Sequence, residues 1–224
     1  MDQSIIESVT LEGVLPARQA RSRQVVVNLL QAALKLLDTR DFLALSIADI
    51  CEGAGVTAGA FYKRFNSKEL FIEFLQRVVL EQTRRRMKPI AIDKFGHLSL
   101  REFLMRSVRG TLQWYREHEG FTRASLKYAQ VYPDSWSPLR ETGLLYSRSI
   151  TPVILEIVKQ SESRKVLDAI QFSAQMMIGT CNNMVLVNPG PYTIHTDKTV
   201  DMMVQAMALL IENAVDTHDK RKGA

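Results

Sequence analysis

The residues of this chain that could bind a phosphate lie close together, between Ser46 and Lys68. This segment reads SIADICEGAGVTAGAFYKRFNSK, with a second hydroxyl at Thr57 and further cations at Lys63 and Arg64. A hydroxyl and the backbone N–H groups at the start of a helix suit the oxygens of a phosphate, as do nearby cations. Small side chains in the middle of the segment would let a helix approach base edges. The chemistry that these residues favour is binding of double-stranded DNA.

Two short helices must position these groups. Ser46 with Asp49 three residues later forms a capping box, which predicts the start of the first helix. Glycine tolerates the backbone conformation of a tight turn, so Gly53 and Gly55 mark its end. Thr57 can cap the second helix. Two short helices joined by a glycine-containing turn are typical of a helix-turn-helix, although the pattern also fits a plain helical hairpin packed on a core.

The rest of the sequence is predicted to be helical as well. Apolar residues recur every three or four positions, and no convincing alternating stretch predicts a strand. Capping residues, glycines and prolines divide the pattern into segments. The fold class expected is all-α, with further helices over residues 22–38, 67–87, 99–131 (interrupted at 120), from 137 onward, 165–187 and 197–216.

Basic charge is concentrated near the N-terminus. Residues 18–88 contain 13 Lys and Arg against 7 Asp and Glu, whereas residues 89–224 contain 16 against 14. A compact basic segment is what binding to a phosphate backbone requires. The charge distribution therefore agrees with the position of the two short helices.

Composition argues against several other classes of protein. With 46% hydrophobic and 24% charged residues the chain resembles an ordinary globular protein. No apolar run reaches the roughly 18 residues of a membrane span, and the first 17 residues lack the basic start and apolar core of an export signal. We therefore expect a cytoplasmic protein with no membrane partner.

No sequence pattern indicates catalysis or a metal. Cys51 and Cys181 form no CxxC motif, and the four histidines lack paired ligand spacing. The sequence contains no GxSxG, Walker A or GxGxxG motif. We expect no metal, no cofactor and no enzymatic activity.

The spaced residues from 42 to 68 resemble the N-terminal signature of the TetR family of bacterial transcription regulators. The resemblance rests on FLALSIADI at residues 42–50 and on AGVT-x-G-x-FY-x-x-F-x-x-K at residues 54–68. It implies an all-α fold with an N-terminal three-helix helix-turn-helix domain and a C-terminal helical ligand-binding and dimerisation domain. The expected division is a tail at 1–17, the DNA-binding domain with its linker helix at 18–88, and the effector-binding and dimerisation domain at 89–224.

The resemblance also implies roles for individual residues. Thr57 would cap the recognition helix and face a phosphate, and Tyr62 and Lys68 would bind backbone phosphates. Ala58, Ala60 and Lys63 would face the bases. Arg64 stands where the family often has histidine. The expected DNA-binding residues are Ser46, Thr57, Ala58, Ala60, Tyr62, Lys63, Arg64 and Lys68.

The function that the resemblance implies is that of a ligand-responsive regulator, expected to be a repressor. It would bind palindromic operator DNA as a homodimer, and a small, mainly apolar effector would release it. Two alternatives stay open: a DNA-binding regulator of the same fold without a small-molecule effector, and a helical enzyme with an accessory DNA-binding head.

Two sets of apolar residues are candidates for the effector pocket and the dimer interface. Aromatic and methionine side chains suit an apolar ligand, although most such residues belong to ordinary core. The candidate pocket residues are Phe103, Trp114, Phe121, Tyr128, Tyr146, Phe172, Met176 and Met177. A stripe on the last helix is expected to pair with its symmetry mate, although it could instead face its own core: Val200, Met203, Val204, Met207, Leu210, Ile211 and Ala214.

Overall fold

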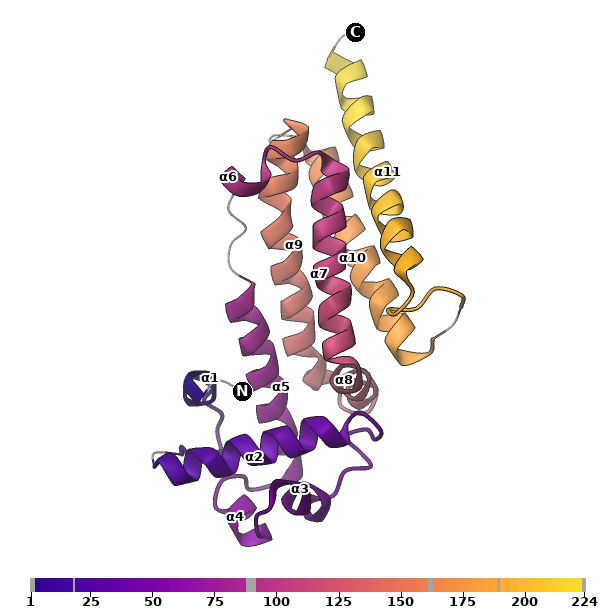
Figure 1. Ribbon diagram of the computed structural model, residues 1–224. Helices are drawn as coiled ribbons and strands as arrows, with labels where there is room; N and C mark the ends of the chain where they lie inside the picture. Colours follow the sequence, from indigo (N-terminus) through magenta and orange to yellow (C-terminus); the bar gives the residue numbers. More distant parts are fainter. Residues whose placement is uncertain (1–2, 18, 88–91, 161–162, 189, 223–224) are drawn as a thin grey trace. The chain divides into compact units, whose positions relative to one another are not determined.

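The computed structural model describes residues 3–17, 19–87, 92–160, 163–188 and 190–222, and the regular structure of these ranges is helical (Figure 1). An isolated bridge between Val14 and Phe65 is the β pairing found there. The elements are α1 (Gln3–Ser8), α2 (Ala20–Leu36), α3 (Ile47–Ala54), α4 (Ala58–Tyr62), α5 (Lys68–Arg86), α6 (Ile92–Phe95), α7 (Leu100–Glu117), α8 (Glu119–Val131), the 3₁₀ helix η1 (Pro133–Trp136), α9 (Ser137–Val158), α10 (Arg164–Leu186) and α11 (Asp197–Lys222).

The helix boundaries follow the capping residues, as predicted. Ser46 and Ser99 each form a capping box, in which the serine hydroxyl accepts from the backbone N–H three residues on. That residue's carboxylate accepts in turn from the backbone N–H of the serine. The all-α prediction is confirmed within the described residues.

The chain divides into two compact units, and each is described by itself. The first comprises residues 1–86 and 119–140, and the second comprises residues 87–118 and 141–224. Within the described residues, no helix has the length and apolar character needed to cross a membrane. No group of His, Cys, Asp and Glu in those ranges is arranged to hold a metal ion.

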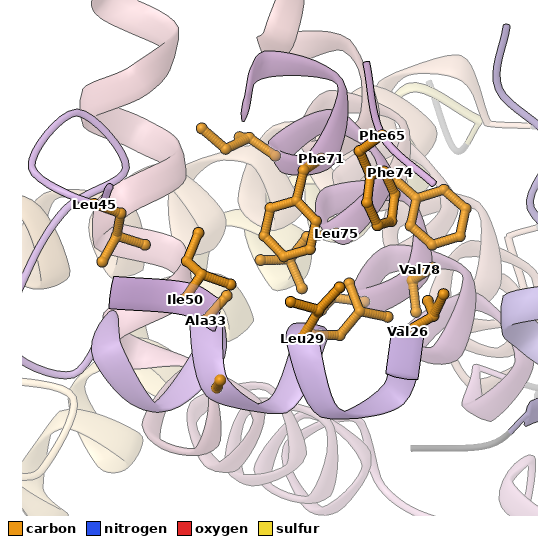
Figure 2. Close-up of a cluster of buried hydrophobic side chains, with 14 of the residues drawn as sticks. Val26, Leu29, Ala33, Leu45, Ile50, Phe65, Phe71, Phe74, Leu75 and Val78 are labelled. Atoms are coloured by element: carbon orange, nitrogen blue, oxygen red, sulfur yellow. The ribbon is translucent and has the colours of Figure 1, made fainter. Parts of the chain in front are cut away.

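The core of the first unit forms where α2, α3 and α5 meet. Figure 2 shows Val26 and Leu29 of α2 beside aromatic and aliphatic side chains of α5, with Ile50 of α3 close by. Four phenylalanines pack in this core, with ring centroids 5.0–5.5 Å apart. They are Phe61, Phe65, Phe71 and Phe74. This aromatic cluster fixes α4 against α5, because Phe61 is the buried residue of that short helix.

The expected tail at residues 1–17 contains a helix that packs on the first unit. Ile5 and Ile6 of α1 are buried in its core. The Arg85 guanidinium donates to the hydroxyls of Ser4 and Ser8 at 3.0 and 2.8 Å. The apolar pair at positions 5 and 6 covers one face of the unit, so this part of the expected division is corrected.

The expected boundary at residue 88 also differs from the compact units. Helix α8 packs with the N-terminal helices, and Phe121, Ala124 and Tyr128 belong to the first unit's core. The apolar face of α8 covers Phe42, whose ring meets those of Phe121 and Tyr128 edge-on. The first unit is therefore built from two separate stretches of chain.

The second unit is a helical bundle around α7, α10 and α11. Helix α11 contacts both α10 and α7, and residues of α9 such as Ile150 and Ile154 complete the core. The Arg101 guanidinium of α7 lies 2.8 Å from the Glu212 carboxylate of α11, an exposed ion pair that adds little stability. Apolar burial holds this unit together.

Candidate nucleic-acid interface

Ser46 fixes the start of α3. Its hydroxyl accepts from the Asp49 N–H at 3.1 Å and donates to Asp49 Oδ2 at 2.6 Å. Asp49 Oδ2 also accepts from the Ser46 N–H and lies 3.1 Å from the Arg40 guanidinium. Hydrogen bonds from Ser46, together with Arg40, lower the pKa of Asp49 below its ordinary value. Both donors of Ser46 are thus used within the cap, so this residue shapes α3.

Gly55 produces the turn between α3 and α4. Its φ of 65° lies in the left-handed region, which glycine adopts without strain. Thr57 then caps α4, and its hydroxyl accepts from the Ala60 N–H at 3.3 Å. Because Oγ1 acts as an acceptor in this cap, its hydrogen is directed away from the helix. The helix start therefore combines N–H groups and a hydroxyl in one exposed place, as binding to a phosphate needs.

The outer face of α4 has almost no side chains. Ala58 and Gly59 are exposed and Ala60 is half-buried, whereas Phe61 on the opposite face is fully buried. A methyl group added at Gly59 would meet only Thr57 Oγ1, at 3.8 Å, so packing does not require glycine there. A bare face held by a rigid aromatic cluster can enter a major groove about 12 Å wide.

Tyr62 and Lys63 extend from the end of α4 into solvent. The Tyr62 side chain is 54% exposed, and its ring meets the Phe61 ring edge-on with the centroids 5.5 Å apart. Lys63 is the C-cap residue and is exposed. Both side chains can therefore reach a ligand without disturbing the core.

Arg64 is oriented by the N-terminal segment. One guanidinium nitrogen donates to the Pro16 carbonyl at 3.0 Å, and the Leu15 N–H donates to the Arg64 carbonyl at 2.9 Å. Together with the Val14–Phe65 bridge, these bonds attach the N-terminal segment to the chain that leaves α4. Sequence analysis missed this contact, since nothing in the sequence pairs residues 14–16 with 64–65.

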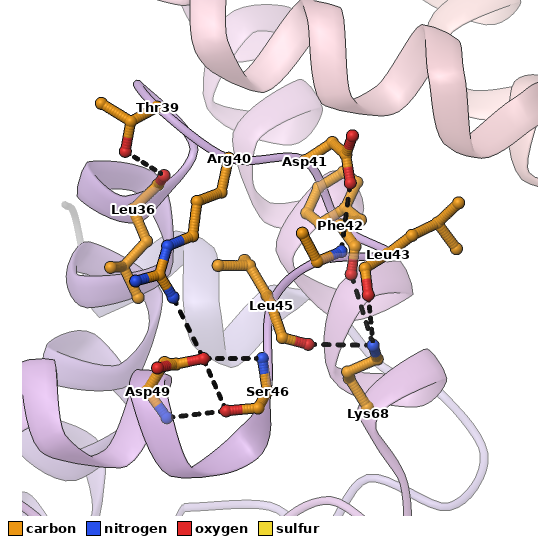
Figure 3. A network of polar contacts seen from close by, with 11 residues as sticks. Leu36, Thr39, Arg40, Asp41, Phe42, Leu43, Leu45, Ser46, Asp49 and Lys68 are labelled. Carbon is orange, nitrogen blue, oxygen red and sulfur yellow. Dashed lines mark hydrogen bonds and ion pairs between the residues drawn. The ribbon is translucent and has the colours of Figure 1, made fainter.

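Lys68 differs most from its expected role. Its ammonium group donates to the carbonyl oxygens of Phe42, Leu43 and Leu45 at 3.4, 3.4 and 2.9 Å (Figure 3). An ammonium group has three hydrogens, and these three acceptors match them. The structure therefore shows Lys68 bound to the turn between α2 and α3.

The eight candidate effector residues do not form one group. Phe121 and Tyr128 lie in the core of the first unit, and Phe172 is 59% exposed on α10. The others belong to the second unit: Phe103, Trp114, Tyr146, Met176 and Met177. The prediction of a pocket lined by all eight is corrected, because α8 packs with the N-terminal helices. A half-open cavity of about 550 Å³ lies in the first unit, where the N-terminal segment covers Phe65 and Phe74.

Polar groups converge inside the second unit. The Tyr146 hydroxyl lies 2.7 Å from the Ser107 hydroxyl and 3.8 Å from the Met177 sulfur. The Tyr115 hydroxyl donates to Asn182 Oδ1 at 2.7 Å. Burial raises the pKa of both tyrosines and that of Cys181, which reaches about 12. Burial therefore favours the protonated form of the Cys181 thiol.

The candidate dimer stripe faces the core of its own unit. Six of its seven residues are buried there: Val200, Met203, Val204, Met207, Ile211 and Ala214. The reason is that α11 lies against both α7 and α10, which cover its most apolar face. Only Leu210 is exposed, and this prediction is corrected for the other six.

A different set of apolar side chains is exposed on the last two helices. Met202 and Leu209 on α11 are 46% and 51% exposed, and Leu210 on the same helix and Phe172 on α10 are exposed as well. Sequence periodicity missed these residues because they lie outside the main stripe of α11. Large apolar side chains exposed on two contacting helices are typical of an interaction surface.

Comparison with known proteins agrees with this geometry. The family model described as bacterial regulatory proteins, tetR family, matches residues 29–73, from α2 to the start of α5. Salmonella enterica GusR shares the fold at 13% identity and a TM-score of 0.60, over 84% of this chain and 95% of that one. A putative TetR-family transcriptional regulator from Rhodococcus sp. is 18% identical with a TM-score of 0.58, over 86% of this chain and 99% of that one. A TetR transcriptional regulator from Rhodococcus sp. RHA1 is 16% identical with a TM-score of 0.52, over 87% of this chain and 98% of that one. No curated protein matches the sequence.

Proposed function

Because the chain belongs, through its N-terminal domain, to the tetR family of bacterial regulatory proteins, we propose that it is a ligand-responsive repressor that binds a palindromic operator as a homodimer. The observation that carries the proposal is the exposed face of α4. This face presents a capped helix start, two small side chains and Lys63 on a rigid aromatic support. That arrangement suits insertion into a major groove.

The proposed division of labour separates phosphate binding from base reading. Thr57 and Tyr62 bind phosphates, and Lys63 reads a base edge beside the bare face of α4. Phosphate contacts carry no sequence information, whereas a lysine bound to guanine discriminates by about 1–3 kcal/mol. Arg64, whose guanidinium donates to the Pro16 carbonyl, follows α4 by two residues and completes the set.

Selection of bound duplexes from a random DNA pool tests the proposal. The expected result is a palindrome with half-sites about 34–36 Å apart, or a multiple of that distance. Lys63→Ala is then expected to relax the preference at one base pair of each half-site, whereas Tyr62→Phe weakens binding to all sequences about equally. If no sequence is enriched over the starting pool, the proposed function is wrong.

Homodimer formation is supported by the exposed apolar side chains of α10 and α11. A two-fold interface uses the same surface on both copies, and Met202, Leu209 and Phe172 are apolar side chains exposed on these two contacting helices. A palindromic operator requires this symmetry.

An effector site in the second unit is supported by its buried hydroxyls. Tyr146 and Ser107 lie among apolar residues that include Phe103 and Met177, so a mainly apolar molecule with one hydrogen-bonding group would suit them. A compound screen by thermal shift, repeated with Tyr146→Phe, tests this part. A compound that stabilises the wild type and releases DNA is expected to act more weakly on the variant. If no compound releases DNA, the regulator without an effector becomes the better description.

A further inference from the structure

The turn between α2 and α3, residues 37–45, is held by a lysine of α5. Lys68, the first residue of α5, donates to three of its carbonyl oxygens (Figure 3). These carbonyls belong to Phe42, Leu43 and Leu45. Lys68 follows α4, the proposed recognition helix, by six residues. Its hydrogen bonds therefore attach the α2–α3 turn to the segment of chain that leaves α4.

A second cation holds the same turn from α8. One guanidinium nitrogen of Arg123 donates to the carbonyl oxygens of Leu37 and Asp38 at 3.1 and 2.9 Å. These carbonyls follow the C-terminus of α2, where a positive charge is favourable. Lys127, one helical turn further along α8, lies 3.6 Å from the Asp41 carboxylate. Lys68 and Arg123 together thus satisfy five carbonyls of one turn.

Close packing accompanies these hydrogen bonds. Phe42 is 1% exposed, and its ring meets those of Phe121 and Tyr128 edge-on, with centroid distances of 6.4 and 5.7 Å. A Cβ atom on Gly120 would overlap the backbone carbonyl of Leu37, so only glycine permits α8 to lie this near. The contact between α8 and the turn is therefore specific in shape as well as in charge.

The turn also continues into the start of α3. Arg40 within it pairs with Asp49, and Asp49 completes the capping box with Ser46 (Figure 3). A displaced turn would carry Arg40 away from this box. The orientation of α3, and of α4 beyond it, thus depends on how the turn is held.

We propose that α8 is a positioning element for DNA binding, in which Arg123 and Gly120 fix the start of the α2–α3 turn while Lys68 fixes its end. Lys68 accordingly acts as a positioning residue and makes no phosphate contact. The inference rests on the proposed DNA-binding function, because the orientation of α4 matters only if α4 meets a ligand.

Salt dependence separates positioning from phosphate binding. Removing one cation that binds a phosphate reduces the slope of log K against log salt by about 0.9. Arg123→Met and Lys68→Met are expected to weaken binding to the selected operator about tenfold at every salt concentration, with the slope of the wild type. Arg123→Lys, which retains the charge, is expected to recover part of the affinity. If Lys68→Met lowers the slope by about 0.9 for each copy of the chain on the operator, its assignment as a positioning residue is wrong.

Arg116→Met is the matched control. Arg116 also donates to a backbone carbonyl, that of Ile194 at 2.6 Å, but within the second unit. This variant is expected to bind the operator as the wild type does. A decrease in affinity as large as that of Arg123→Met would show that removing any arginine–carbonyl bond has this effect, and would overturn the proposal.

Amide hydrogen exchange in the DNA-free protein tests the positioning independently of the operator. Arg123→Met is expected to speed exchange over residues 46–62, whereas Arg116→Met leaves these amides unchanged. If Arg123→Met speeds exchange but the wild type binds no operator, the proposed function is contradicted. The link between α8 and the orientation of α3 and α4 would then still hold. Unchanged exchange together with wild-type affinity in Arg123→Met would refute the proposal.

Discussion

At the scale of single residues, the proposed interface depends on small side chains as much as on polar ones. Ala58 and Gly59 leave the front of α4 bare, while Phe61 anchors its back in the aromatic cluster. A helix of five residues would not be stable alone, because isolated short helices are marginal in water. The cap at Thr57 and the buried Phe61 together make it rigid.

Gly59→Ala is expected to separate stability from binding. Alanine is favoured over glycine within a helix by roughly 0.5–1 kcal/mol, and the structure has room for the methyl group. That methyl group would stand on the face proposed to approach base edges. Thermal melting should therefore show a protein at least as stable as the wild type, while a gel-shift titration shows weaker operator binding.

Gly110→Ala is the control for this substitution. Gly110 is exposed within α7, and an added Cβ would meet nothing within 4 Å. The Gly110→Ala variant should gain similar stability and keep full operator affinity. Equal affinities for the two alanine variants would mean that the face of α4 makes no close approach to DNA.

Asp49 is expected to make the first unit sensitive to acid. Hydrogen bonds from Ser46 and the pairing with Arg40 lower its pKa in the folded protein, so its contribution is present above the unfolded value of about 3.9. The contribution is lost as the pH falls through the lowered value. Asp49→Asn should lower the melting temperature at about pH 6 more than at about pH 3. A pH-independent difference would contradict this role.

At the scale of elements, the sequence predicted where helices begin and end more reliably than what their faces meet. Ser46, Thr57 and Ser99 cap helices as expected, because capping is a local interaction within four residues. The apolar stripe of α11 was also real, but periodicity does not reveal which neighbour covers a stripe. Two helices of the same unit cover it, whereas residues outside the stripe are exposed.

The exposed apolar side chains of α11 yield a direct prediction about the proposed homodimer. Met202→Glu and Leu209→Glu would each place two charges across a two-fold axis, so both variants should be monomers in sedimentation velocity and bind the operator weakly. These side chains are exposed, so the second unit itself should remain folded.

Leu144→Glu provides the comparison for this pair. Leu144 is an equally exposed leucine, 47%, on α9. This variant should remain dimeric and keep its operator affinity. Dimers of normal stability in both α11 variants would exclude this face as the interface.

At the scale of the molecule, the units do not follow the order of the chain. Residues 119–140 leave the second unit, join the first and lead back into the second. Sequence analysis assumed contiguous domains because Gly120 shows only that a helix is interrupted, and no local pattern pairs Arg123 with Leu37. The fold class was predictable from local signals, whereas this long-range pairing was not.

A fragment that ends at residue 88 should therefore be unstable. It lacks Phe121 and Tyr128, and removal of one buried aromatic side chain costs about 3–5 kcal/mol. Amide exchange in α2 should be much faster in this fragment than in the full chain, and Phe121→Ala in the full chain should give an intermediate rate. Equal protection in the fragment and the full chain would show that α8 adds nothing to the core.

The split first unit also sets an order of events during synthesis on the ribosome. Residues 1–86 emerge first, but their core cannot close over Phe42 until Phe121 and Tyr128 have followed. At about 5–20 residues per second, the nascent chain exposes this apolar surface for a few seconds. The protein should therefore depend on nascent-chain chaperones at this stage more than a regulator whose DNA-binding domain is contiguous.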